Sequence, residues 1–187
     1  MPSAYAIAAV FLVILVVFWL VRAYNALVRL NALAQEAWSA IEVQLKRRHN
    51  LVPNLVAAVR GYADHERTVL VEQVTKARAD SVKSRGIQQT QTSENVLTSE
   101  LKGLFAVAEA YPDLKANAGY LDLQKQLAEV EDQIQFARRY YNGTVRDLNI
   151  AIQSFPSNVV AGLFRFKRAE FFELETALER PAPEVKL

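Results

Sequence analysis

The chain has 187 residues, 51% of them hydrophobic, and its 22 basic and 20 acidic side chains leave a net charge of +2. This length suits one domain with a single core, and the near balance of charge gives no long-range attraction to nucleic acid or to acidic substrates. Cysteine is absent, which excludes thiolate nucleophiles, disulfides and cysteine metal sites. A total of 6 glycines argues against a β-rich or loop-rich fold.

Residues 1–21 carry no charged side chain. As a helix rising about 1.5 Å per residue they reach about 30 Å, which is the thickness of the hydrocarbon core of a bilayer. A cleavable signal peptide would begin with basic residues and end with small ones, and this segment has neither feature. Basic residues follow the apolar run at Arg22, Arg29 and 46–48. The sequence therefore predicts a retained membrane anchor over 1–22, with the N-terminus outside and the body in the cytoplasm.

Apolar residues at helical spacing predict four further helical segments, over about 23–48, 50–84, 93–111 and 123–153. No stretch alternates polar and apolar residues with period two, so no strand is expected. The predicted fold is all-α, with an N-terminal transmembrane helix followed by a long up-and-down four-helix bundle over 23–155.

The polar segment 84–95, S-R-G-I-Q-Q-T-Q-T-S-E-N, lacks periodicity and is predicted to be a surface loop. Ser93 or Asn95 is expected to cap the short helix that follows, and Pro112 is expected to end it. The sequence S-F-P-S at 154–157 should end the longest helix.

The basic residues Lys46, Arg47 and Arg48 suit the negative pole of a helix C-terminus. Asn50 would then cap the next helix, and Pro53 would fall in its first turn, where a missing N–H has no cost. The segment therefore predicts a corner between two helices, and the alternative is a continuous helix kinked at the proline. The cluster is too short for nucleic-acid recognition, and it lies roughly 36 Å past the membrane edge along a straight helix, beyond the ~8 Å screening length for lipid attraction.

The two histidines, His49 and His65, are candidates for a metal site only if they meet in space. His65-Glu66 begins like the zinc-protease helix H-E-x-x-H, but position 69 is Val and the second imidazole is missing. We expect 64–66 to form a solvated face. Because no catalytic elbow or phosphate-binding glycine loop is present either, the sequence predicts no catalytic, cofactor or metal residue.

Segment 156–178 is rich in phenylalanine and interleaved with basic residues. Its rings either pack back onto the bundle as a short terminal helix, or form a contact surface for another copy or for the bilayer interface. Residues 179–187 are expected to be disordered. The candidate oligomer or membrane contacts are Phe155, Leu163, Phe164, Phe166, Phe171, Phe172 and Trp38.

Three asparagines, Asn25, Asn142 and Asn149, lie on or beside the apolar stripes. Buried amides at such positions can fix the register between helices. We therefore interpret them as candidate register-setting residues.

Several segments together resemble the LemA family of bacterial membrane-anchored proteins. They are Y-N-x-L-V at 24–28, the block S-A-I-E-V-Q-L-K-R-R-H-N-L-V-P-N-L-V at 39–56, G-Y-A-D-H-E at 61–66, A-Y-P-D-L-K-A at 110–116, A-R-R-Y-Y-N-G-T-V at 137–145 and F-P-S-N at 155–158. The resemblance implies a single N-terminal span in the inner membrane, a cytoplasmic helical bundle, no accepted catalytic residues, and association with membrane proteases or with systems that shape membranes.

From these observations we expect a non-enzymatic scaffold that assembles with its own copies at the membrane. The alternative is an adaptor for a membrane protease or another membrane enzyme. Neither reading involves a cofactor or nucleic acid, and both involve membrane lipid around the N-terminal helix.

Overall fold

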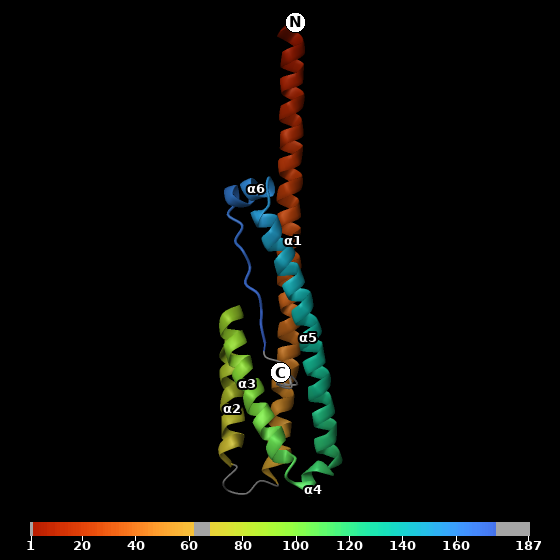
Figure 1. Cartoon of the computed structure of the whole chain (residues 1–187), viewed down its shortest axis with the longest axis vertical. Helices are drawn as coiled ribbons and strands as arrows, with labels where there is room; N and C mark the ends of the chain where they lie inside the picture. The colour runs from red at the N-terminus through yellow and green to blue at the C-terminus, as the bar shows by residue number, and fades with distance from the viewer. Residues whose placement is uncertain (1, 62–67, 175–187) are drawn as a thin grey trace, which may run out of the picture. The chain divides into compact units, whose positions relative to one another are not determined.

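The computed structural model describes residues 2–61 and 68–174. Within these ranges it contains no strand and six helices, shown in Figure 1: α1 Pro2–Arg60, α2 Thr68–Lys83, α3 Ile87–Ala108, α4 Pro112–Lys115, α5 Ala118–Gln153 and α6 Ser157–Leu163. The prediction of an all-α fold, with a long apolar N-terminal helix followed by a helical bundle, is confirmed. The predicted end of the helix over 123–153 at 154–157 is also confirmed, because α5 ends at Gln153.

The predicted corner at Lys46, Arg47, Arg48, Asn50 and Pro53 is wrong, because α1 continues through all five residues. The alternative of a continuous helix is the one that the structure shows, with the proline inside it. The apolar stripe explains the continuity, since buried positions recur at three- and four-residue spacing before and after the proline. They are Ile41, Leu45, Arg48, Val52, Leu55 and Val59.

A side chain from α2 compensates for the proline inside α1. Pro53 has no N–H, so the carbonyl of His49, four residues earlier, loses its donor within the helix. The Nε of Arg78 donates to that carbonyl at 2.6 Å. The backbone acceptor that the proline leaves open is thus occupied by a charged donor, and the helix continues.

The predicted loop over 84–95 is also wrong, because α3 already begins at Ile87. The turn between α2 and α3 contains Gly86, whose φ of +76° is a conformation that favours glycine. Two polar residues, Thr90 and Glu94, are buried on α3 and extend the stripe of Leu97 toward the N-terminus of the helix. Since the buried face of this segment is polar, apolar periodicity could not detect it.

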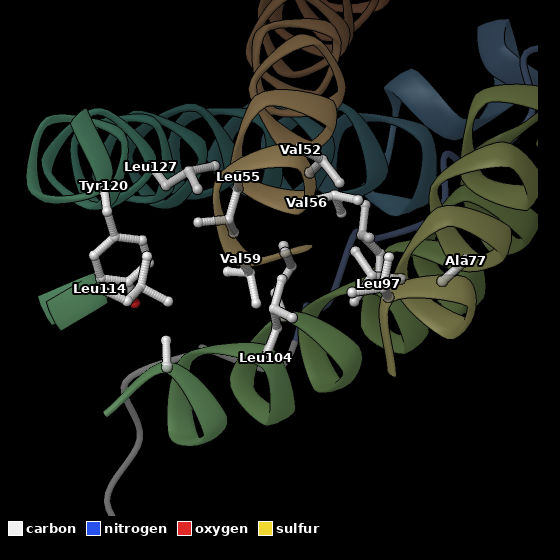
Figure 2. Close-up of a cluster of buried hydrophobic side chains, with 14 residues drawn as sticks. Val52, Leu55, Val56, Val59, Ala77, Leu97, Leu104, Leu114, Tyr120 and Leu127 are labelled. Carbon is white, nitrogen blue, oxygen red and sulfur yellow. The ribbon is translucent and has the colours of Figure 1, made fainter. Parts of the chain in front are cut away.

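The chain divides into two compact units, of which the second comprises Ala40–Arg138 and the described residues from Phe172. Its core is formed by residues from five helices, and α2 packs against α3. Figure 2 shows side chains of α1, α3 and α5 turned toward a common centre, with Leu114 of α4 and Ala77 of α2 at its edges. The core residues are Val52, Leu55, Val56, Val59, Val71, Val74, Ala77, Leu97, Leu101, Leu104, Ala108, Leu114, Tyr120 and Leu127.

The first unit comprises the described residues up to Ser39 together with Arg139–Phe171. Its C-terminal stretch has no helix after Leu163 and is attached by side chains of α5. The Asn149 amide donates to the carbonyl of Ala169 at 2.9 Å and accepts from its N–H at 2.9 Å. The Tyr141 hydroxyl donates to the carbonyl of Glu170 at 2.8 Å. These bonds supply backbone partners to a segment that has no secondary structure of its own.

The pairing of Pro53 with Arg78 predicts a measurable coupling. Replacing Arg78 with methionine should lower the free energy of unfolding by about 1–3 kcal/mol, because the His49 carbonyl then lacks a partner. In a Pro53→Ala background the loss should be smaller, since an alanine at this position restores the helical N–H to that carbonyl. Urea unfolding followed by circular dichroism of the detergent-solubilised chain measures both losses.

The control is Lys76→Met, which removes an exposed cation from the same helix and should cost the same in both backgrounds. Equal losses for Arg78→Met with and without Pro53 would show that the arginine does not serve the proline.

Candidate functional site

Two groups of side chains among the described residues are candidates for a functional site. One is a group of charged and polar side chains in the second unit, all buried except the partly buried His49. We call it the buried charge cluster: Arg48, His49, Ser81, Glu94, Thr98 and Glu131. The other is a group of exposed apolar side chains in the first unit, which we call the apolar corner: Phe155, Val159, Leu163 and Phe164.

Arg48 is the centre of the buried charge cluster, with 3% of its side chain exposed. Its Nη1 lies 3.5 Å from a carboxylate oxygen of Glu94 and 3.5 Å from one of Glu131. Its Nη2 donates to the Thr98 hydroxyl at 2.6 Å. One guanidinium from α1 therefore joins α3 and α5 within the second unit.

Glu94 of α3 is fully buried and has partners on two other helices, α1 and α2. Besides Arg48, its carboxylate contacts the Nε2 of His49 at 2.6 Å and accepts a hydrogen bond from the Ser81 hydroxyl of α2. A buried carboxylate costs free energy unless it is paired and hydrogen-bonded, and here both oxygens have partners. The cluster is thus a closed set of interactions rather than a free nucleophile or base.

Cavities lie on two sides of this cluster. Arg48 and Glu131 line a cavity of about 380 Å³ together with Lys102 and Phe105. His49 and Glu94 line another of about 350 Å³. In the ranges 2–61 and 68–174, no group of three or more His, Asp or Glu side chains could hold a metal ion. The proposed meeting of His49 with His65, and the predicted solvated face at 64–66, lie outside the described residues.

The sequence carried a signal for the cluster that apolar periodicity did not use. Arg48 falls between Leu45 and Val52 on the buried stripe of α1, and Glu131 falls between Val130 and Ile134 on that of α5. An arginine on one apolar stripe and glutamates on two others predict a buried ion pair, because each would otherwise be unpaired in the core.

The N-terminal part of α1 exposes its apolar side chains. In the described part of the chain, one helix is long and apolar enough to cross a membrane, and its most apolar stretch is not covered by other residues. Side chains between Tyr5 and Phe18 are 48–74% exposed. Uncovered apolar surface of this length matches the hydrocarbon core of a bilayer.

Directly after this stretch, α1 packs against α6 within the first unit. Val160 and Ala161 of α6 are buried against Leu27, with Leu20 and Ala23 at the edge of the same contact. In Figure 1, α6 lies beside α1 at the end of α5. The turn into α6 is held by Ser157, whose hydroxyl contacts the carbonyl of Ala151 at 2.6 Å.

Another face of α6 forms half of the apolar corner, and the residues that flank the helix form the rest. Val159 and Leu163, four residues apart on one helix face, are 58% and 69% exposed. Phe155, just before α6, is 82% exposed and Phe164, just after it, is 53% exposed. The exposed basic residues that follow are Arg165, Lys167 and Arg168.

The candidate contact residues thus separate into exposed and packed ones. Phe171 is 42% exposed, while Phe166 is half-buried with its ring 5.9 Å from that of Tyr24. Trp38 is half-buried, and its ring lies 5.5 Å from that of Tyr141. Phe172 is fully buried, so its assignment as a contact residue is wrong: its ring is already enclosed by its own chain.

The three asparagines also differ in their surroundings. Asn149 is buried and bonds to the backbone of the C-terminal segment, whereas Asn25 is exposed and Asn142 is half-buried. A register-setting role between helices therefore does not describe Asn149, whose partner is an extended segment. For Asn142 the role stays a prediction.

Two buried tyrosines have altered acidity. Burial raises the pKa of Tyr141 to about 12, and the negative charge of Glu170 adds to the effect. Burial also raises the pKa of Tyr120, again with a carboxylate, Glu109, adding to it. The Tyr141 hydroxyl therefore stays protonated at neutral pH and remains a donor to the Glu170 carbonyl.

These features define a membrane-associated helical protein with one candidate span and a folded helical body. The sequence model of the LemA family matches residues 37–187, and the chain belongs to that family. The chain is 27% identical to magnetosome protein MamQ 1 of Paramagnetospirillum magneticum, over 87% of this chain and 69% of the relative. It is 26% identical to magnetosome protein MamQ of Magnetospirillum gryphiswaldense, over 94% and 74%. It is 30% identical to protein LemA of Metamycoplasma hominis, over 73% and 63%.

The buried charge cluster predicts a large difference between two arginines. Arg48→Met leaves two buried glutamates without their cation and should lower the free energy of unfolding by about 3–5 kcal/mol. Arg146→Met breaks an ion pair with Asp147 whose side chains are 67% and 56% exposed, and should change stability by less than about 0.5 kcal/mol. Chemical unfolding of both variants under one condition makes the comparison, and similar losses would contradict a buried cluster.

Proposed function

We propose that this protein is a non-enzymatic, membrane-anchored scaffold whose copies assemble at the cytoplasmic face of the inner membrane. The observation that carries the proposal is the continuity of α1. Its exposed apolar stretch and residues 22–39 belong to one helix and one compact unit, with no linker between them. The first unit, attached in this way, keeps its position relative to the bilayer, which suits holding other molecules in place.

The assembly of copies is supported by apolar side chains that remain exposed outside the span. On α5, Phe136 is 60% exposed and Tyr140 is 55% exposed, and aromatic residues are enriched at protein interfaces. A shared membrane raises the effective concentration of tethered copies, so weak contacts suffice for assembly.

The orientation follows from the charge around the span. Basic residues begin at Arg22, directly after the apolar stretch, and the positive-inside rule puts the side that carries them in the cytoplasm. A role in organising or shaping membrane follows from the resemblance to the LemA family. The charged side chains that meet inside the body are buried and paired with one another, which suits a structural role better than a catalytic one.

Site-specific cross-linking tests assembly and orientation together. The chain has no cysteine, so Tyr140→Cys and Arg146→Cys each introduce a unique thiol at an exposed position of α5. A membrane-impermeant bis-maleimide should leave both variants unmodified in intact cells, and should give a cross-linked dimer of identical copies once the inner membrane is opened.

The cysteine-free chain is the control for reagent specificity. Mixing membranes that separately contain tagged and untagged copies controls for chance collisions, and should give no mixed cross-link. A single band with an unlike protein would contradict the scaffold and favour the adaptor, and reaction in intact cells would reverse the orientation.

A further inference from the structure

We propose that the apolar corner docks into the interface of the same bilayer that α1 crosses, as a second membrane contact of each copy. The occupant is the lipid surface, with acyl chains against Phe155, Val159, Leu163 and Phe164, and anionic headgroups against the basic residues after α6. The inference rests on the membrane anchor of the proposed function, and it does not depend on assembly.

α6 packs against α1 just past the end of the apolar run. The apolar run of α1 ends at Val21, and α6 packs on residues 20–27 of the same helix within the same unit. At about 1.5 Å per residue, this contact covers roughly 10 Å beyond the end of the run. The headgroup layer on one side of a bilayer is roughly 5–7 Å thick, from a total of 40–45 Å around a core of 30 Å. α6 is therefore placed at the level of the headgroups.

α6 has one face that packs against α1 and another that exposes apolar side chains. Val160 and Ala161 are used in the contact with α1, while Val159 and Leu163 are left exposed on another face. Helices that lie in the membrane interface bury their apolar side chains about 5–10 Å into the boundary between headgroups and acyl chains. α6 suits this position, because one of its faces packs against α1 and another exposes apolar side chains.

The positive charge next to the apolar corner favours contact with lipid over contact with a second copy. Between 154 and 169 the chain has three basic residues, Arg165, Lys167 and Arg168, and no acidic one. All three are exposed, as is Arg22 at the end of the span. Facing another copy at the same corner would bring like charges together, whereas anionic headgroups attract them.

The aromatic residues around α6 fit the same environment. The Tyr24 ring lies 4.6 Å from the ring of Phe164, and both are partly exposed. Tyrosine prefers the membrane–water interface, where its ring contacts lipid and its hydroxyl reaches water. Tyr24, which contacts Phe164 of the apolar corner, therefore extends the docking surface to α1.

Depth-dependent fluorescence quenching tests the docking on the full chain in lipid vesicles. Three variants each have one cysteine that is labelled with an environment-sensitive dye. Leu163→Cys places the dye on the apolar corner, Arg146→Cys places it on α5, and Phe11→Cys places it in the span. In vesicles containing anionic lipid, the dye at 163 should shift to shorter emission wavelengths and lose fluorescence to nitroxides placed near the headgroups. The dye at 146 should show neither change, and the dye at 11 should be quenched by nitroxides deep in the acyl chains.

Three outcomes overturn the proposal in distinguishable ways. If the dye at 11 is quenched and the dye at 163 is not, the apolar corner stays in water and only the membrane anchor is supported. If neither is quenched, the membrane anchor itself fails. If the dye at 163 shifts with protein density but not with nitroxide lipid, the corner contacts a second copy. As a matched test of charge, replacing Arg165, Lys167 and Arg168 by glutamine should lower quenching at 163, with quenching at 11 unchanged.

Discussion

The structure depends on α1 remaining helical in two solvents, because one helix supplies both the apolar membrane stretch and part of two folded units. Pro53 threatens that continuity by removing the donor to the His49 carbonyl. The Arg78 side chain replaces the missing donor and comes from a different helix, α2. The integrity of α1 around the proline is therefore a property of the folded bundle and not of the α1 sequence alone.

The buried charge cluster acts on the same part of the chain. Buried ion pairs add little net stability compared with apolar residues, but they strongly penalise any arrangement that separates their members. Because Arg48 contacts both Glu94 and Glu131, sliding or rotating α3 or α5 against α1 would leave a buried charge without its partner. The cluster thus specifies which helix faces meet in the second unit.

Apolar periodicity predicted the all-α fold, the long apolar N-terminal helix and the long α5, because these features are encoded in residues close in sequence. It failed at 84–95, where the polar residues Thr90 and Glu94 face the core. The rules for helix ends and caps failed at Pro53, where the deciding partner is Arg78 of another helix. The interpretation of Arg48 as part of a C-terminal helix turn missed its position on the buried stripe of α1, which indicates a paired charge. The packing of α6 against Leu27 joins residues far apart in sequence, so no local pattern could show that the apolar corner lies beside the span.

No flexible linker separates the apolar stretch of α1 from the rest of the first unit, because residues 22–39 continue the same helix. Amide hydrogen exchange of the full chain in lipid nanodiscs, resolved by peptide mass spectrometry, tests it most directly. We expect slow exchange through residues 22–39, with protection continuing on both sides of Pro53. Fast exchange between 22 and 39, at the rate of an unstructured peptide, would contradict it, because the body would then be tethered loosely.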